Sequence, residues 1–427
     1  MTAGGWAWYD VSMTPIELFT QGLGLQAPWR VSSSDFNVKD GLRLVLSCDE
    51  TASLCCPQCG KPCPRYDATE REWQHLGFWQ HATHLRARVP RVSCSEHGVR
   101  LVSVPWARPE MGFTLLFEAF ALQLIKEMPV LAAARLLGVT DQRLWRLIHH
   151  HVDVSRSEQL LTRVTKIGID ETSANAKTPY ITVVVDMDSA RVVFATPGKD
   201  GATIEAFSKD FTEHGGDPTN ITDVSSDMSA AFISGVNAHL PKAQITFDKF
   251  HVTKLVTEAL DEVRRAEVAT EGFAAILKGS RYALLRNVET QSEDQAALAR
   301  VIALPQLHLK SGRAYRLKLA FQDAYRHCGD QGVTALRNWC SWARRSQLPD
   351  FLRVARTIRS HWDGVIRYFT SRLTNAVLEG INSLIQSAKA RARGFRTVKN
   401  LIAMVYVIAG KLPFPQPSPR RHLLGPW

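Results

Sequence analysis

Three acidic residues stand at positions where carboxylates could hold catalytic metal ions. Asp170 ends one apolar segment, Asp227 ends another, and Glu379 lies on a helix predicted late in the chain. Carboxylate oxygens from different elements are the ligands that Mg²⁺ prefers. Two such ions, about 3.5–4 Å apart, stabilise the transition state of phosphodiester cleavage. We therefore predict a site for two Mg²⁺ ions, open to Mn²⁺ as well, in which Asp170 bridges both ions and Asp227 and Glu379 hold one each.

The elements that carry Asp170 and Asp227 follow from residue type and periodicity. The sequence predicts strands over residues 166–170, 180–186, 191–196, 221–226 and 243–247, and helices over residues 201–213 and 229–240. Three consecutive strands followed by alternating helix and strand is the order of an α/β ribonuclease H-like fold, in which the first and fourth strands are neighbours. Asp170 and Asp227 are then expected at one sheet edge. The nearby acids Glu171 and Asp223 rank lower because the pleat points them elsewhere.

The helix that carries Glu379 has a polar stripe. Its members recur at steps of three and four residues: Asn375, Glu379, Asn382, Gln386, Lys389 and Arg393. The other side is apolar: Val377, Leu378, Ile381, Leu384 and Ile385. This pattern predicts a metal site, with Asn375 and Asn382 beside it, that continues into a track for phosphates along Lys389, Arg391, Arg393 and Arg396. The alternative is a plain amphipathic surface helix whose polar side faces water.

A second metal site is predicted near the N terminus. Cys56 and Cys59 form one pair of ligands, and Cys94 and His97 form another after a gap of 34 residues that leaves room for a small sheet. Two such knuckles are what tetrahedral zinc needs. With four protein ligands no position stays open for chemistry, so the zinc would be structural. Cys55 and Cys63 are spare thiols, and the alternative is a set of unrelated buried cysteines.

A helical pattern follows the cysteines. An Ala-rich helix over residues 130–137, a turn at Gly138 and a further helix over residues 141–151 are typical of a helix-turn-helix. The second helix of this motif enters the major groove of DNA. Gln142, Arg143 and Arg146 would then face DNA. An ordinary helical hairpin is the alternative, since such hairpins are common in helical connections.

The positive charge of the chain is confined to its last part. Residues 351–427 contain 13 Lys and Arg against two acids, while the first 350 residues carry 39 charges of each sign. This segment therefore carries the whole formal net charge of +11. Positive charge clustered in this way indicates a polyphosphate partner such as double-stranded DNA. A solubilising basic face is the alternative. Trp342, beside two arginines, could stack on an unpaired base or simply pack in a core.

Composition bounds the class of protein. The uncharged run at residues 401–410 is too short to span a bilayer, so we expect no membrane segment and a cytoplasmic protein. The predicted domains are a zinc-binding module (1–110), a helix-turn-helix (111–152), a ribonuclease H-like core in two parts (160–260 and 356–412) that a helical insertion (261–355) interrupts, and a disordered basic tail (413–427).

The chain resembles bacterial insertion-sequence transposases of the ISL-three type, which belong to the acidic-triad (DDE) group. The resemblance runs from about Pro15 to Leu412 and is carried by residues 27–31, the two knuckles, and residues 132–139, 169–171, 226–228, 248–251, 278–282, 372–382 and 393–395. It leaves Met1 and Met13 as alternative starts. His97 departs from the family, where cysteine is more common.

The resemblance implies a function and roles for residues. Asp170, Asp227 and Glu379 would be the catalytic triad, with Asp248 and His251 supporting them. Such enzymes cut DNA at the terminal inverted repeats of their own element and join the 3′ ends to target DNA by transesterification. A homodimer or larger homo-oligomer at the nucleoid is expected. Two other classes stay open: a nuclease that does not join DNA, and a non-catalytic zinc and helix-turn-helix regulator.

Overall fold

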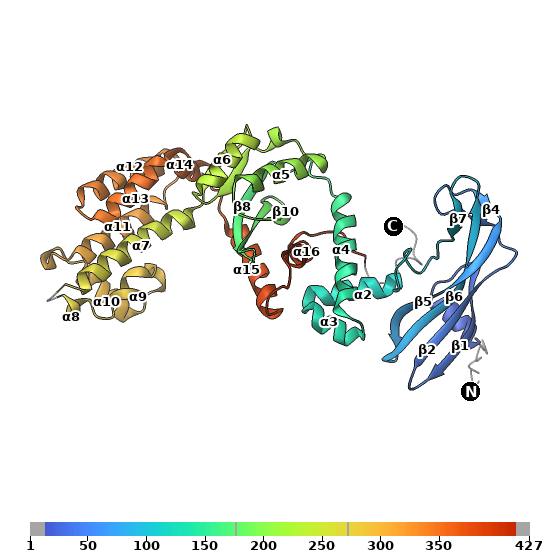
Figure 1. Ribbon diagram of the computed structural model, residues 1–427. Helices are drawn as coiled ribbons and strands as arrows, with labels where there is room; N and C mark the ends of the chain where they lie inside the picture. Colours follow the sequence, from blue (N-terminus) through green and yellow to red (C-terminus); the bar gives the residue numbers. More distant parts are fainter. Residues whose placement is uncertain (1–12, 176, 271–272, 416–427) are drawn as a thin grey trace, which may run out of the picture. The chain divides into compact units, whose positions relative to one another are not determined.

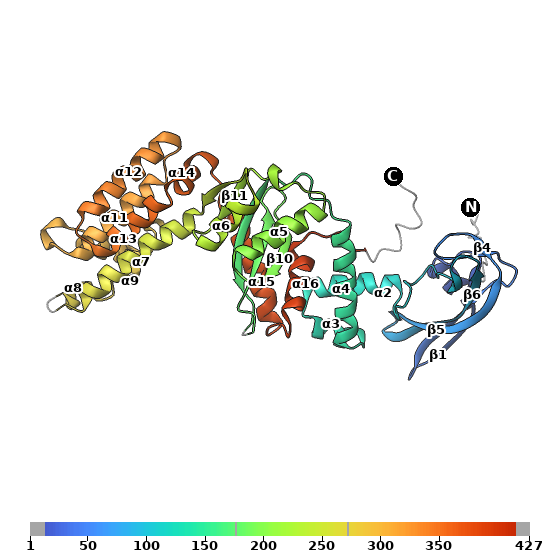
Figure 2. The same ribbon diagram turned by 45° about the horizontal axis from the view of Figure 1, so that its top comes forward.

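The computed structural model describes residues 13–175, 177–270 and 273–415, which divide into two compact units (Figures 1 and 2). Within these residues, unit 1 comprises residues 13–151 and 413–415, and unit 2 comprises residues 152–412. The alternative starts at Met1 and Met13 concern residues 1–12, which lie outside the described part of the chain, as do residues 416–427 of the predicted tail.

Unit 1 begins with helix α1 (Pro15–Gly22) and a five-stranded sheet. The strands are β1 (Trp29–Asn37), β2 (Gly41–Cys48), β5 (Arg65–Phe78), β6 (His81–Cys94) and β7 (Gly98–Leu101), in the order β1-β2-β6-β5 with β7 also paired to β6. The predicted sheet between the two cysteine pairs is therefore the long antiparallel β5–β6 ladder. Trp106 packs edge-on against Trp29 and Trp73, with ring centroids 4.9 and 5.4 Å apart, and anchors the core of this sheet.

Three helices complete unit 1, and the sequence predicts the last two of them. They are α2 (Leu115–Glu127), α3 (Val130–Leu137) and α4 (Asp141–Ser157), whose last residues reach into unit 2. Gly138 ends α3 in the left-handed region, at φ 65°, where a residue without Cβ is not strained. Glu118 is fully buried on α2, where its carboxylate accepts a hydrogen bond from Arg108 at 2.8 Å. The same carboxylate lies 2.9 Å from His151 Nε2.

The imidazole of His75 makes the stability of unit 1 depend on pH. Burial lowers the pKa of His75 to about 4, from 6.5 in an exposed histidine. The unfolded chain therefore takes up this proton first as the pH falls, and the stabilisation is lost between about pH 6.5 and pH 4, by up to about 3 kcal/mol. Urea unfolding followed by tryptophan fluorescence should show this slope. His75→Gln should flatten it, and equal slopes in the two proteins would contradict the prediction.

Unit 2 is built on a mixed five-stranded sheet. Its strands are β8 (Lys166–Ser173), β9 (Tyr180–Asp186), β10 (Arg191–Pro197), β11 (Asp223–Ser226) and β12 (Gln244–Phe247), in the order β10-β9-β8-β11-β12. The first three strands pair antiparallel, whereas β8, β11 and β12 are parallel. The predicted adjacency of the first and fourth strands is confirmed.

Helices cover both faces of this sheet. Ile167 and Ile169 of β8 pack with helices α5 (Gly201–Glu213) and α6 (Ala230–His239) on one face. Gly168 points to the other face, which α15 (Ala376–Arg391) and α16 (Val398–Ala409) cover. There the Tyr406 hydroxyl accepts a hydrogen bond from the backbone N–H of Ala195 at 3.0 Å. The result is a three-layer α/β arrangement with β8 at its centre.

A helical segment lies between β12 and α15 (Figure 1). Its helices are α7 (Lys249–Val268), α8 (Ala274–Leu277), α9 (Ser280–Leu285), α10 (Glu293–Ile302), α11 (Lys310–Ala324), α12 (Gly329–Arg345), α13 (Pro349–Ser360) and α14 (Trp362–Ser371). They share one apolar core that extends from Phe247 to Phe369. The predicted limits of 261 and 355 fall inside α7 and α13, because apolar periodicity alone did not show where the helices begin.

The last described residues differ from the predicted disordered tail. Phe414 is only 5% exposed, and the ammonium group of Lys126 lies 5.2 Å from its ring centroid. The Pro-rich composition suggested disorder from residue 413, but one aromatic side chain is enough to fix residues 413–415 on unit 1. In the described part of the chain, no helix is both long and apolar enough to cross a membrane.

Candidate functional site

Asp170 and Asp227 lie at the same edge of the unit 2 sheet. Gly168 pairs with Ser225 in the parallel β8–β11 ladder, so two residues further on Asp170 and Asp227 stand side by side. Burial raises the pKa of Asp170 to about 6, and the negative charge of Asp227 contributes in the same direction. The edge therefore concentrates negative charge in a poorly solvated place, where a cation would be stabilised.

Helix α15 is fixed along β8 by its polar stripe. Asn382 donates a hydrogen bond to Asp170 Oδ2 at 2.7 Å, Gln386 donates to Thr172 Oγ1 at 2.6 Å, and Lys389 donates to the Ser173 carbonyl at 3.0 Å. The stripe thus faces the sheet, and Lys389 is held by β8 rather than presented as the start of a phosphate track. The predicted apolar side is also only partly buried.

Two residues show how closely α15 approaches the sheet and which of its side chains point away from it. A Cβ on Gly168 would lie 2.5 Å from Leu378 Cδ1, so glycine lets the helix lie this close without a shift of that side chain. Leu384, predicted on the buried side, is 54% exposed. It points away because Asn382 and Gln386 occupy the position against β8. Spacing alone showed two sides of this helix but could not say which one the sheet would cover.

Glu379 is positioned by contacts on both sides of it. Four residues earlier, the backbone N–H of Asn375 donates to Asp248 Oδ1 at 3.3 Å, and the Ser225 hydroxyl donates to Asn375 Oδ1. One turn later, Asn382 contacts Asp170. Glu379 itself is exposed and lines a cavity together with Asp248. The helix therefore spans the edge at which Asp170 and Asp227 lie.

Asp248 and His251 form an ion pair at the start of α7. His251 Nδ1 lies 3.3 Å from Asp248 Oδ2, and this contact raises the pKa of His251. Burial acts to raise the pKa of Asp248, but hydrogen bonds from His251 and from the Asn375 backbone outweigh it and lower the pKa. Asp248 thus stays ionised although it is only 2% exposed. The charges of Asp170 and Asp227 also raise the pKa of His251, which places its ring near the acidic edge.

The donor set at this edge fits a hard cation. The Oδ1 atom of Asn382 is buried without a hydrogen-bond partner, while the amide of the same side chain binds Asp170. Carboxylate and carboxamide oxygens are the ligands that Mg²⁺ prefers. The carboxylate oxygens of Asp170, Asp227 and Glu379 nevertheless do not all lie within 4.8 Å of one another. Among the described residues, only the predicted zinc ligands Cys56, Cys59, Cys94 and His97 have ligand atoms that lie this close together.

The other two acids of this region have different partners. Asp223, at the opposite end of β11, accepts a hydrogen bond from Arg367 at 2.7 Å. Burial acts to raise the pKa of Asp223, but the contact with Arg367 outweighs it and lowers the pKa. Glu171 lies 3.9 Å from the ammonium group of Lys199. Both therefore already have cationic neighbours, which agrees with their lower rank.

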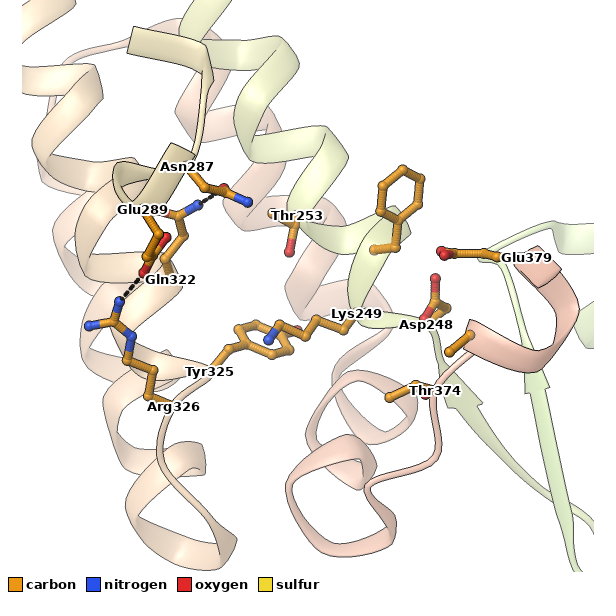
Figure 3. Close-up of a pocket in the computed structure, with 12 residues that line it drawn as sticks. Asp248, Lys249, Thr253, Asn287, Glu289, Gln322, Tyr325, Arg326, Thr374 and Glu379 are labelled. Carbon is orange, nitrogen blue, oxygen red and sulfur yellow. Dashed lines mark hydrogen bonds and ion pairs between the residues drawn. The ribbon is translucent and has the colours of Figure 1, made fainter. Parts of the chain in front are cut away.

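The cavity beside Glu379 has a volume of about 460 Å³ (Figure 3). It lies between α15 and the helical segment, and its wall includes Asp248, Lys249, Asn287, Gln322, Tyr325 and Glu379. Apart from the two acids, these residues were missed by sequence reasoning. Lys249 lies in the stretch 248–251 that the family resemblance includes, but the other residues come from separate parts of the helical segment and are brought together only by packing.

The predicted zinc ligands lie close together in unit 1. Cys56 and Cys59 follow the short strand β3 (Leu54–Cys55), which pairs with β4 (Pro62–Cys63), and Cys94 and His97 join β6 to β7. Each knuckle ends in a glycine at positive φ, Gly60 at 71° and Gly98 at 68°. Backbone N–H groups of Glu96 and His97 lower the pKa of Cys94 to about 7, which favours the thiolate.

The spacing of these four ligand atoms fits tetrahedral zinc. They all lie within 4.8 Å of one another, with Cys59 Sγ to Cys94 Sγ at 3.7 Å, Cys94 Sγ to His97 Nδ1 at 3.6 Å and Cys56 Sγ to His97 Nδ1 at 3.8 Å. Bonds of about 2.3 Å to sulfur and 2.0–2.1 Å to nitrogen require tetrahedral edges of about 3.6–3.8 Å. The cluster therefore supports structural zinc, with His97 as the fourth ligand and Cys63 outside the group.

The residues predicted to face DNA are placed differently from one another. Gln142 and Arg146 are exposed on α4. Arg143 turns inward instead: its guanidinium lies 4.0 Å from the Phe113 ring centroid and donates to the Gly112 carbonyl at 3.2 Å, and burial lowers its pKa. On the helical segment Trp342 is 39% exposed, and Arg391, Arg393 and Arg396 are exposed near the end of α15.

Comparison with known families covers most of the chain. Residues 167–405 match a DDE-type transposase family of the ISL3 group, residues 102–152 match the helix-turn-helix domain of transposase family ISL3, and residues 53–97 match the zinc-finger of transposase IS204/IS1001/IS1096/IS1165. The helix-turn-helix reading of α3 and α4 is thereby confirmed over the alternative of an ordinary hairpin, and it implies DNA binding.

Individual relatives carry the same description. The chain is 32% identical over 451 residues to the transposase for insertion sequence element IS1557 from two strains of Mycobacterium tuberculosis, which covers 96% of this chain and 98% of the relative. It is 27% identical to the transposase for IS1001 from Bordetella parapertussis, over 80% of this chain and 86% of the relative. A simian T-cell lymphotropic virus intasome matches 41% of the chain at 15% identity, but its TM-score of 0.18 says nothing about the fold. The chain belongs to the ISL3 family of insertion-sequence transposases.

Proposed function

We propose that the protein binds the terminal inverted repeats of its own insertion sequence, cuts the element ends and joins the 3′ ends to target DNA by transesterification. The observation that carries this proposal is the sheet edge of unit 2. Asp170 and Asp227 stand side by side there on parallel strands, and α15 brings Glu379 across the same edge through contacts of Asn375 and Asn382. This order of strands and helices supports a ribonuclease H-like core that α7–α14 interrupt.

Each side chain at the edge has a proposed task. Asp170, Asp227 and Glu379 would hold two Mg²⁺ or Mn²⁺ ions, which when bound activate the attacking water or 3′ hydroxyl and stabilise the charge on the phosphate. Asn382 orients the Asp170 carboxylate through its 2.7 Å hydrogen bond. Asn375 fixes the start of α15 on Asp248. His251 offsets part of the negative charge of the edge, so that three carboxylates can remain ionised near one another.

DNA recognition is assigned to unit 1 and to the end of α15. Gln142 and Arg146 on α4 would contact base edges in the major groove. Arg391, Arg393 and Arg396, which are exposed near the end of α15, would contact phosphates. Lys389 and Arg143 serve packing through their hydrogen bonds to the carbonyls of Ser173 and Gly112. At least two copies of the chain are proposed to act together at the nucleoid, since two element ends must be cut and joined.

One assay tests this proposal against its alternatives. DNA duplexes that carry the repeats flanking the gene are incubated with the protein and Mg²⁺, and a second set with pre-cut 3′ ends is offered a target plasmid. A transposase yields both cut ends and joined products. A nuclease that does not join DNA yields only the first, and a non-catalytic regulator binds the duplex but yields neither. Absence of cleavage and joining in Mg²⁺ and in Mn²⁺ would refute the proposal.

A further inference from the structure

The cavity beside Glu379 holds polar groups that the proposed chemistry does not use. Its wall is formed by α7, α11, α15 and the short helix η2 (Val288–Thr290) that follows Asn287. Figure 3 shows the carboxamides of Asn287 and Gln322 at one end and the carboxylates of Asp248 and Glu379 at the other. Lys249 lies between the two ends. The two ends therefore differ in chemistry.

The carboxamide end presents one free donor and one free acceptor. Gln322 Nε2 donates to Asn287 Oδ1 at 2.8 Å, which links the two side chains. The Asn287 amide and the Gln322 carbonyl form no other hydrogen bond in the described part of the chain, and both residues line the cavity. An adjacent donor and acceptor match the edge of a nucleobase, as when a carboxamide binds the N6 and N7 atoms of adenine.

The middle of the cavity carries a positive charge. The ammonium group of Lys249 lies 5.7 Å from the ring centroid of Tyr325 and 5.9 Å from that of Tyr368, and it forms no ion pair with a described acid. Arg326, by contrast, is paired with Glu289 at 2.9 Å on the cavity wall. Lys249 is thus the cation that stays available, next to the acidic edge at which a phosphate would be cut.

We propose that this cavity takes one unpaired nucleotide of the DNA end, next to the phosphate that is cut. The base would lie on Asn287 and Gln322, and its phosphate would lie by Lys249. A volume of about 460 Å³ is in the range of pockets that enclose small ligands. Taking a base out of the duplex costs a few kcal/mol, which contacts to its edge can offset. This inference rests on the proposed function, because it assumes that DNA ends reach Glu379.

The test uses 2-aminopurine, whose fluorescence rises when it leaves the base stack. Repeat-end duplexes carry the probe at single positions on either side of the cut, and the full-length protein is added in Ca²⁺ so that binding is seen without cleavage. At one position we expect fluorescence to rise by roughly threefold or more. The double variant Asn287→Leu with Gln322→Leu should lose most of this rise, and Lys249→Gln should reduce it.

Asn338→Leu is the matched control. It makes the same chemical change at an exposed carboxamide on α12 that does not line the cavity, so the rise should be kept. Circular dichroism of each variant reports folding.

The outcomes separate this inference from the proposed function. A wild-type protein that cuts and joins the repeat ends, with unchanged fluorescence at every position, overturns the nucleotide site and leaves the transposase function intact. A protein that shows the fluorescence rise but never cuts DNA supports the nucleotide site and contradicts the proposed transposase function. Equal fluorescence in the double variant and the wild type also overturns the assignment of Asn287 and Gln322.

Discussion

Asp227→Asn is expected to reduce end cleavage by at least about 1,000-fold, which corresponds to about 4 kcal/mol of lost transition-state stabilisation. The substitution keeps the shape of the side chain but removes the charge that stands beside Asp170 at the sheet edge. Without that charge a divalent cation loses one of its proposed ligands. Single-turnover cleavage of repeat-end duplexes measures the effect, and gel-shift affinity should stay the same because α4 is untouched.

Asp223→Asn provides the matched control. It makes the same substitution four residues earlier in the chain, at the opposite end of β11, where Asp223 pairs with Arg367. Its loss should lower stability slightly and leave the cleavage rate within a few-fold of wild type. If Asp227→Asn cuts DNA as fast as wild type, Asp227 does not belong to the catalytic triad.

Cys94→Ser is expected to release zinc and unfold the two knuckles of unit 1. Structural zinc contributes about 10–16 kcal/mol of apparent binding energy in small modules, more than the sheet can replace. Native mass spectrometry should show loss of one zinc ion for each chain. Hydrogen exchange should show loss of protection in β6 and β7, which meet at Cys94 and Gly98.

The neighbouring thiols supply the controls for this prediction. Cys55→Ser and Cys63→Ser should each retain zinc, because neither residue belongs to the group of four ligand atoms. His97→Cys should also retain it, with four thiolates in place of three. A Cys94→Ser protein that still holds one zinc ion and keeps its protection would contradict the ligand assignment.

The parts of the structure that follow from local pattern were predictable. The strands that carry Asp170 and precede Asp227, the turn at Gly138 and the paired cysteine knuckles depend on residue types within short windows. The succession of strands and helices then predicted that β8 and β11 are neighbours. Glu379 could be placed on a helix in the same way. The resemblance to a known family then gave these residues their expected roles.

Features that depend on packing could not be predicted. Spacing showed two sides of α15, but β8 contacts members of both: Leu378 of the apolar side packs against Gly168, and Asn382 of the polar stripe binds Asp170. Arg143 satisfied the pattern of a DNA contact, yet the ring of Phe113 holds it inward. The pairing of Asn287 with Gln322 joins η2 to α11 across 35 residues, and no window of sequence contains that information.

The hydrogen bond between Ser225 and Asn375 also orders events during synthesis. These residues are 150 positions apart, and the whole helical segment lies between them. Contacts at such separation form late, because the intervening chain must first become compact. A growing chain therefore acquires the zinc knuckles and α4 well before α15 reaches the sheet. Under the proposed function, such a chain would carry its DNA-binding helix before Glu379 joins Asp170 and Asp227, so an unfinished or truncated protein would bind DNA without the complete set of acids that cleavage needs.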